Sequence, residues 1–158
     1  MKATVNWQQN MTFIGAADSG FPIKMDSDGS VGGNNEGARP MELLALGLAG
    51  CTAMDVISIL RKKRQQVTQF EVRVDAPRSK EYPKVFMRAL ITYIVTGTRV
   101  SEEAVLRSIE LAATKYCPAQ FMFAQVFPIA VQYEIYEDAG SGTRQLTYQG
   151  AWQAAPQE

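Results

Sequence analysis

Two thiols are the side chains in this sequence with the clearest capacity for chemistry. The 158 residues contain two cysteines, Cys51 and Cys117, and no histidine. Without histidine, a Ser-His-Asp triad, a Cys-His pair and the HExxH and Cys₂His₂ zinc sites are excluded, and two cysteines cannot form a Cys₄ site. The sequence also lacks the phosphate-binding patterns GxxxxGK[ST] and GxGxxG. Any chemistry must therefore come from thiols, carboxylates, arginine, lysine or tyrosine.

Cys51 lies in the apolar segment LALGLAGCTAMD, where Gly47 and Gly50 precede it and Ala53 follows it. Glycine in a helix interior costs about 1 kcal/mol relative to alanine. Two glycines this close together indicate that another helix or a substrate comes near this part of the chain. Spacing alone leaves two interpretations open: a reactive thiol, or a small buried side chain in a tightly packed helix.

Cys117 directly precedes Pro118, a residue that suits the first position of a helix. A thiol at a helix N-terminus has a lowered pKa and a larger thiolate fraction, so this position predicts a reactive thiol. The alternative is a cysteine that fills a break in the chain. Asp55 lies four residues after Cys51, roughly on the same helix face, and a carboxylate there is expected to raise the thiol pKa.

The composition is typical of one globular domain, with 46% hydrophobic residues. Lysine plus arginine number 16, as do aspartate plus glutamate, so the net charge of zero indicates no nucleic-acid partner. The basic run at 61–64 favours a solvated helix end. Residues 1–7 contain no apolar signal-peptide core, so we expect a cytoplasmic protein whose cysteines are free thiols.

The elements that must position the thiols follow from periodicity and turn residues. Alternating apolar residues predict a strand at 2–7, and 12–16 and 21–25 are two further strand candidates before a glycine-rich loop at 26–38. Pro40 then opens a helix at 41–66 that is apolar on nearly every side as far as Leu60, so we expect it to be buried. The apolar stretch 43–60 is long enough to span a membrane, but Asp55 and two glycines favour a core helix, so no membrane partner is expected.

The second half of the chain predicts strands at 70–74, 85–95 and 128–136 and helices at 101–116 and 118–125. The whole pattern predicts an α+β fold over a single domain, residues 1–137. Residues 138–158 are rich in Gly, Ser, Gln and Thr, which indicates a C-terminal extension. Its apolar side chains are expected to pack on the domain or on a neighbouring subunit; they are Leu146, Tyr148 and Trp152.

The segment RPMELLALGLAGCTAMDVISIL, followed by KYCP 66 residues after Cys51 (117 − 51), resembles the OsmC/Ohr family of thiol-dependent hydroperoxide reductases, in its PMEL-type subgroup. The N-terminal strands and the closing segment VFPIAVQYEI match as well, over about residues 1–137. The resemblance implies an OsmC-like fold, with antiparallel sheets wrapped around a long buried central helix. It also implies an intertwined homodimer with active sites at the subunit interface.

The resemblance further implies a reaction for the two cysteines. Cys51 would attack an organic hydroperoxide and become a sulfenic acid, which condenses with Cys117 to a disulfide. An external dithiol, often lipoyl-linked in the family, would then restore both thiols. We therefore expect a role in oxidative and osmotic stress defence, with no bound cofactor or metal.

The chain departs from the peroxidase branch of the family around the start of the central helix. That branch has a glutamate directly after the helix-opening proline and an arginine further upstream, whereas here the proline is followed by Met41 and then Glu42. Arg39 is the candidate for stabilising the thiolate, with Glu42 as its partner, although Glu42 lies about 180° from Cys51 on a straight helix. A second hypothesis therefore stays open: a non-catalytic protein of this fold that binds a small apolar ligand or senses redox change.

Overall fold

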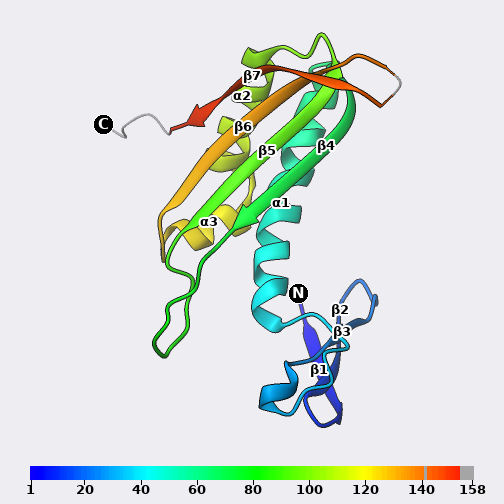
Figure 1. Ribbon diagram of the computed structural model, residues 1–158, viewed down its shortest axis with the longest axis vertical. Helices are drawn as coiled ribbons and strands as arrows, with labels where there is room; N and C mark the ends of the chain where they lie inside the picture. Colours follow the sequence, from blue (N-terminus) through cyan, green and yellow to red (C-terminus); the bar gives the residue numbers. More distant parts are fainter. Residues whose placement is uncertain (141, 154–158) are drawn as a thin grey trace. The chain divides into compact units, whose positions relative to one another are not determined.

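Figure 1 shows the computed structural model, which describes residues 1–140 and 142–153. The chain forms two compact units, Met1–Leu46 and a second unit that begins at Gly47. Each unit contains one β-sheet, and helices lie between the strands along the chain, so the predicted α+β fold class is confirmed. The boundary between the units falls inside the central helix.

The first unit is built on a three-stranded antiparallel sheet, as the alternating N-terminal sequence predicts. Its strands are β1 (Ala3–Gln9), β2 (Thr12–Ala17) and β3 (Ile23–Met25), paired in that order. The glycine-rich loop that follows contains one turn of 3₁₀ helix, η1 (Gly29–Val31). The buried carboxylate of Asp26 organises this loop by accepting backbone N–H bonds from Ser27, Asn34 and Glu36 at 2.7, 3.1 and 3.1 Å.

The central helix α1 (Pro40–Lys62) begins where the sequence predicts and ends earlier than expected. Its predicted end at residue 66 is wrong because Arg64 adopts a left-handed backbone conformation, with φ of 57°. The backbone N–H of Gln65 then bonds the carbonyl of Leu60 at 3.0 Å, a Schellman closure that satisfies a carbonyl at the helix end. The chain reverses at this point and enters the second sheet.

Only one stripe of α1 is buried in the single chain. The buried side chains within the second unit recur every four residues: Leu48, Thr52, Val56 and Leu60. Met54, between them, is 74% exposed, so the expectation of a helix buried on every side is wrong for one chain. Among the described residues, α1 is the one helix long and apolar enough to cross a membrane, a property that core helices share.

The second unit contains a four-stranded sheet in the order β4–β5–β6–β7. The bounds of its strands are Gln66–Asp75, Ala89–Thr98, Ile129–Asp138 and Arg144–Trp152. Neighbours β4–β5 and β6–β7 are antiparallel, but β5 and β6 are parallel, so the expected antiparallel pairing fails for this one pair. The reason is the helical crossover between β5 and β6, which returns the chain to the same end of the sheet.

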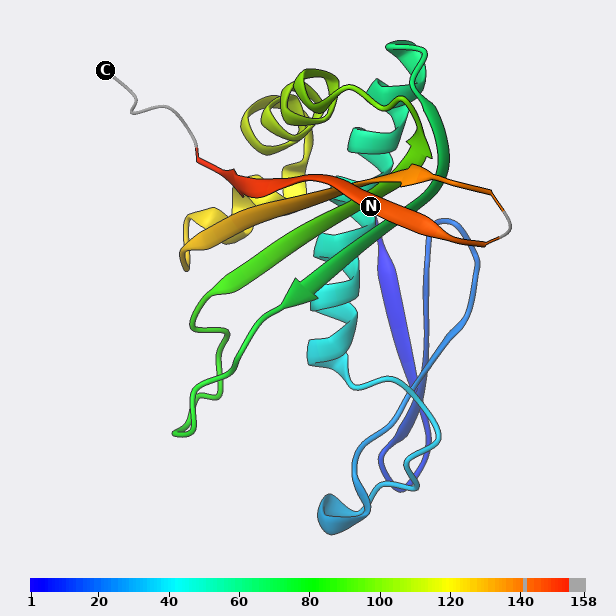
Figure 2. The same cartoon turned by 45° about the horizontal axis from the view of Figure 1, so that its top comes forward.

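That crossover contains α2 (Glu102–Leu111), η2 (Ala112–Tyr116) and α3 (Pro118–Ala124). Figure 2 shows these helices and α1 on one face of the sheet. Apolar side chains from the central strand β5 fill the space between sheet and helices, among them Ile91, Tyr93 and Val95, each 0% exposed. The predicted strand at 85–95 is shifted, because residues 85–88 belong to the protruding hairpin between β4 and β5 (Figure 1).

The polar C-terminal residues form a strand that the sequence did not predict. β7 pairs along β6, with Trp152 opposite Val131 and Gly150 opposite Tyr133. A Cβ at Gly150 would lie 2.8 Å from the Tyr133 hydroxyl, so the strand fits closely only with glycine there. Trp152 packs against the core as expected, whereas Leu146 and Tyr148 are 42% and 46% exposed. The end of the predicted extension, residues 154–158, lies outside the described residues.

Candidate active site

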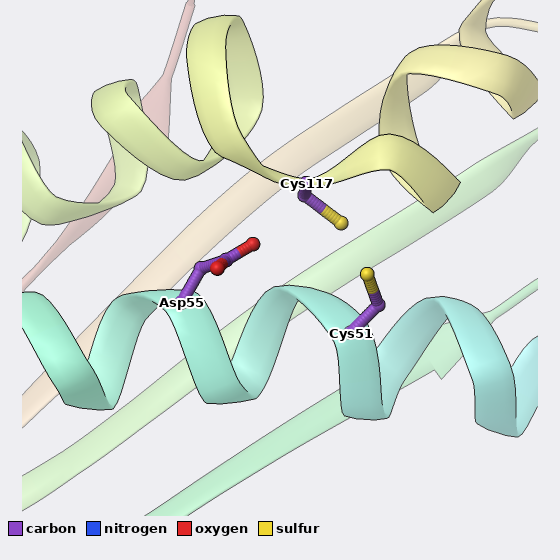
Figure 3. A group of neighbouring side chains, drawn as sticks. All are labelled: Cys51, Asp55 and Cys117. Atoms are coloured by element: carbon purple, nitrogen blue, oxygen red, sulfur yellow. The ribbon is translucent and has the colours of Figure 1, made fainter.

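The two cysteines face each other in the second unit. Cys51 lies on α1, and Cys117 lies between η2 and α3, and Figure 3 shows their thiols directed toward one another. The two Sγ atoms and a carboxylate oxygen of Asp55 all lie within 4.8 Å of one another. Both cysteines are free. The structure therefore brings together the two thiols that the sequence singled out.

Local backbone geometry brings Cys117 to this position. The sequence predicts one helix over 101–116, but α2 changes into a π-helical turn, η2, over its last five residues. The backbone of Cys117 is extended, and its Sγ accepts the N–H of Gln120 at 3.4 Å, which makes this thiol the N-cap of α3. π-Helical turns are frequent at functional sites because they redirect the residues that follow. The predicted position of Cys117 at a helix N-terminus is thus confirmed.

The predicted thiolate character of Cys117 is wrong. The side chain is 3% exposed, and burial raises the pKa of the Cys117 thiol well above its ordinary value. The Gln120 N–H lowers this pKa, but Cys51 and Asp55 raise it further. The pKa of Asp55 is itself raised by burial. Asp55 thus raises the pKa of Cys117, whereas its expected effect on Cys51 stays a prediction.

A buried chain of polar side chains lies next to the thiols, and sequence reasoning missed it. The hydroxyls of Thr52 and Tyr93 hydrogen-bond to each other, and Thr52 donates to Oε1 of Gln120 at 3.4 Å. Burial raises the pKa of Tyr93 to about 12, so its hydroxyl stays protonated. These contacts join α1, β5 and α3 around Cys117. The one signal in the sequence was a threonine on the same four-residue stripe as Leu48 and Val56.

Arg39 and Glu42, the other two predicted site residues, lie in the first unit. The Arg39 guanidinium donates to the carbonyl of Gly37 at 3.3 Å and to the side chain of Asn35. Glu42 accepts the backbone N–H of Arg39 at 2.9 Å, so this carboxylate caps the start of α1. Arg39 also lines a mostly apolar cavity of about 390 Å³. A role for either residue at the thiols stays a prediction.

A second, smaller cavity of about 280 Å³ opens beside Cys117. Its apolar lining includes Tyr116, Phe121 and Met122, whose side chains are 49%, 65% and 61% exposed. Around the other thiol, a Cβ at Gly47 or Gly50 would meet no atom of the described residues within 4 Å. The described residues of the second unit thus supply no neighbour at the Cβ position of either glycine.

The structure is that of an α+β protein with a mixed sheet and helices on one face of it. Two free thiols face each other between the central helix and the crossover. The family of OsmC-like proteins matches residues 33–132. Protein YhfA of Escherichia coli K12 is 36% identical over 135 residues, which cover 85% of this chain and 98% of that protein. The chain therefore belongs to the OsmC-like protein family, as its sequence resemblance predicts.

Solved structures show the same fold. A hypothetical protein from Aquifex aeolicus VF5 is similar with a TM-score of 0.76 and 26% identity, over 87% of this chain and 96% of that one. An organic hydroperoxide resistance protein from Elizabethkingia anophelis, with thiocyanate bound, is similar with a TM-score of 0.60 and 17% identity, over 84% and 92% of the two chains. The second likeness concerns the fold alone.

Proposed function

We propose that this protein is a thiol-dependent organic hydroperoxide reductase, in which Cys51 is the nucleophile and Cys117 the resolving thiol. The observation that carries the proposal is the approach of the two Sγ atoms to within 4.8 Å, with both thiols directed at each other. The name of the Elizabethkingia anophelis relative in fold supports the same class of reaction.

The reaction needs two displacement steps, the first at a peroxide oxygen and the second at the Cys51 sulfur. The Cys51 thiolate attacks one peroxide oxygen, the O–O bond breaks, and the alkoxide takes a proton and leaves as the alcohol. The resulting Cys51 sulfenic acid is attacked by the Cys117 sulfur, and the S–O bond breaks with loss of water and formation of the disulfide. The two thiols thus supply two electrons to the peroxide. An external dithiol reduces the disulfide by thiol–disulfide exchange.

The different environments of the two thiols support this division of roles. Cys51 is half-buried, whereas Cys117 is 3% exposed, so a peroxide reaches Cys51 more easily. The raised pKa of Cys117 keeps that thiol protonated while it waits for the sulfenic acid. Disulfide formation requires a sulfur separation of about 2.05 Å. Cys117 sits at the junction of two short helical segments, where a small backbone shift can close the gap.

The substrate class follows from the surroundings of Cys117. The cavity beside this thiol is lined by the exposed apolar side chains of Tyr116, Phe121 and Met122. Burial of alkyl or aromatic carbon against them is favourable at roughly 25 cal/mol per Å². We therefore propose organic hydroperoxides rather than hydrogen peroxide as the preferred substrates. A dithiol reductant that carries an alkyl chain, of the lipoyl type, would use the same surface.

We also propose a cytoplasmic homodimer. α1 leaves Met54 74% exposed, and β1 leaves Val5 and Trp7 55% and 64% exposed, so each unit, taken by itself, presents apolar surface that its own described residues leave open. Exposed apolar patches of this kind mark protein interfaces. Within the dimer, Arg39 is proposed to stabilise the Cys51 thiolate, with Glu42 as the partner of Arg39. No membrane or nucleic-acid partner is part of this proposal.

The test is consumption of cumene hydroperoxide by the reduced protein with a dithiol reductant. We expect Cys51→Ser to abolish turnover. Cys117→Ser should instead stop at one equivalent of peroxide per chain, with a sulfenic acid that dimedone traps on Cys51. Asp75→Asn, a change at the exposed end of β4, serves as the control and should match the wild type. Equal turnover in Cys51→Ser and wild type would exclude the mechanism.

A second candidate function, binding of a small apolar ligand without catalysis, is favoured by one observation. The cavity of about 390 Å³ in the first unit combines apolar side chains such as Met11 and Phe13 with the charged Arg39, and Asp26, whose carboxylate accepts three backbone N–H bonds, also lines it. Such a site suits a ligand with an apolar body and an anionic group. If a fatty acid binds the protein stoichiometrically, Arg39→Ala abolishes that binding and peroxide is not turned over, this candidate replaces the first.

A further inference from the structure

The thiol pair is accompanied by a third side chain that the peroxidase reaction does not require. Cys51 and Asp55 are four residues apart on α1, a spacing that presents two ligands on one helix face. Cys117 faces them from the start of α3, and Figure 3 shows the Asp55 carboxylate on the same side of α1 as the Cys51 thiol. One oxygen and two sulfurs thus converge within 4.8 Å of one another.

These separations are closer to those of a metal site than to those of a disulfide. Zn–S and Zn–O distances of about 2.3 and 2.0 Å place tetrahedral ligands roughly 3.8 Å (S–S) and 3.5 Å (S–O) apart. From separations of at most 4.8 Å, the two sulfurs need to approach by about 1 Å or less and each sulfur–oxygen pair by about 1.3 Å or less. A disulfide between the same sulfurs requires a far larger approach, to about 2.05 Å.

The charges of the three groups also favour a cation. A metal ion that binds here displaces the thiol protons, and the two thiolates and the carboxylate then bring three negative charges into a space where Cys117 is 3% exposed. None of the ion pairs found among residues 1–140 and 142–153 involves Cys51, Asp55 or Cys117. A divalent cation offsets most of this charge. Thiolates together with a carboxylate are donors that zinc accepts.

The groups behind the cluster resemble the supporting shell of a metal site. The Gln120 N–H donates to the Cys117 Sγ at 3.4 Å, and the Gln120 side chain is itself held by Thr52 at 3.4 Å. Hydrogen bonds of this kind orient sulfur ligands and are worth about 10–100-fold in metal affinity. Three protein ligands leave a tetrahedral ion with one open position for water or another small ligand.

We propose that the reduced protein binds one divalent cation of the zinc class through Cys51, Asp55 and Cys117. The binding is independent of any reaction with peroxide. Its consequence for redox chemistry rests on the proposed function: one hydroperoxide and two protons convert the bound dithiolate to the disulfide, an alcohol and water, and the cation is released. Oxidation of the thiol pair thus removes two of the three ligands and displaces the bound cation.

The experiment uses the full-length protein, reduced and kept under nitrogen, with Co²⁺ as a spectroscopic probe for the zinc site. We expect one Co²⁺ per chain, with sulfur-to-cobalt charge-transfer absorbance and the intense visible bands of tetrahedral cobalt. Added Zn²⁺ should displace the cobalt and remove both signals. Cys51→Ser and Cys117→Ser should each lose the charge-transfer band or reduce it to half or less.

Asp55→Asn distinguishes a site with three protein ligands from one in which the two thiols alone bind the metal. We expect this variant to bind Co²⁺ at least about tenfold more weakly, since even the partners of ligands contribute that much. The matched control is Asp75→Asn, which removes a carboxylate outside the cluster and should bind as the wild type does. Thermal unfolding of each variant establishes that it is folded.

Two outcomes overturn the proposal. Full charge-transfer absorbance in either cysteine variant shows that the thiol pair is not the ligand set. Equal affinities in folded Asp55→Asn and Asp75→Asn remove Asp55 from it. Because the titration contains no peroxide, it is independent of the proposed function: a protein that binds Co²⁺ without consuming cumene hydroperoxide refutes the reductase alone, and the reverse result refutes the metal site alone.

Discussion

The Sγ of Cys117 accepts the backbone N–H of Gln120 at 3.4 Å, so a thiol occupies the capping position that Ser, Thr, Asp or Asn usually holds. The bond orients the sulfur toward α1 and satisfies one of the free N–H groups of α3. Burial nevertheless dominates the electrostatics, and the pKa of Cys117 is raised. The arrangement positions a neutral thiol rather than stabilising a thiolate, which suits a resolving cysteine.

Asp55→Asn is predicted to lower the pKa of Cys117, because the substitution removes a negative charge that raises it. The measurement is a pH titration of thiolate ultraviolet absorbance in the Cys51→Ser background, where Cys117 is the remaining thiol. The midpoint in Cys51→Ser/Asp55→Asn should lie below that in Cys51→Ser. An unchanged midpoint would contradict the assigned role of Asp55, and Cys51→Ser/Asp75→Asn is the control.

The folded protein is predicted to lose stability in alkali. Cys117 and Tyr93 have raised pKa values in the folded state, Tyr93 from 10.0 to about 12, so their protonated forms are favoured there. Their contribution to the free energy of unfolding is complete below the unfolded-state pKa values, about 9 for Cys117 and about 10 for Tyr93. It is lost as the pH rises from these values through the folded-state pKa values. Urea midpoints measured across this range should fall, and Tyr93→Phe should flatten the fall above pH 10. A midpoint independent of pH above 10 in the wild type would refute the prediction.

The polar chain behind the thiols is predicted to be cooperative. Thr52→Val and Tyr93→Phe should each cost about 1–3 kcal/mol in the free energy of unfolding, because each leaves a buried partner unsatisfied. The double variant should cost less than the sum, since the two hydroxyls bond to each other. Chemical denaturation measures all three. Tyr148→Phe, at a hydroxyl on a half-exposed side chain, is the control and should change stability little; strict additivity would argue against the coupling.

Gly50→Ala is predicted to weaken the proposed dimer without lowering the stability of the folded chain. Within the described residues a Cβ at this position meets nothing within 4 Å, and alanine favours a helix by about 1 kcal/mol, so the chain itself should be no less stable. The proposed dimer should be weakened, because the added methyl group occupies space that a second α1 needs. Sedimentation equilibrium measures the dimer dissociation constant, with Glu103→Ala on α2 as the control. A constant equal to that of the wild type would mean that no partner approaches Gly50.

Local sequence signals, such as helix-capping residues, were sufficient to predict several parts of the structure. Pro40 and Glu42 mark the start of α1 because proline suits the first turn and a carboxylate caps it. Ser101 marks the start of α2 for a similar reason. The two cysteines were identified by the motif around them, and the structure brings them together.

The features that were not predicted depend on contacts distant in sequence or on unusual backbone conformations. The end of α1 is set by Arg64, a non-glycine residue in the left-handed region, which residue type does not signal. β7 does alternate Leu146, Tyr148 and Trp152 with other residues, but the polar composition of the tail outweighed this pattern, and the strand pairs along the edge of β6. The raised pKa of Cys117 comes from burial and from Cys51 and Asp55 on another helix, so it was not readable from the helix position alone.

The separation of the two cysteines along the chain has a consequence for the whole fold. Cys51 precedes β4 and Cys117 follows β5, so a bond between them would enclose 66 residues (117 − 51), including two neighbouring strands of the sheet. Closing a loop of this size removes enough freedom from the unfolded chain to stabilise the folded one by about 4 kcal/mol at 25 °C. Oxidation would thus cross-link the core of the second unit and stabilise it, and reduction would remove that cross-link. Resistance to unfolding would then report the redox state of the thiol pair.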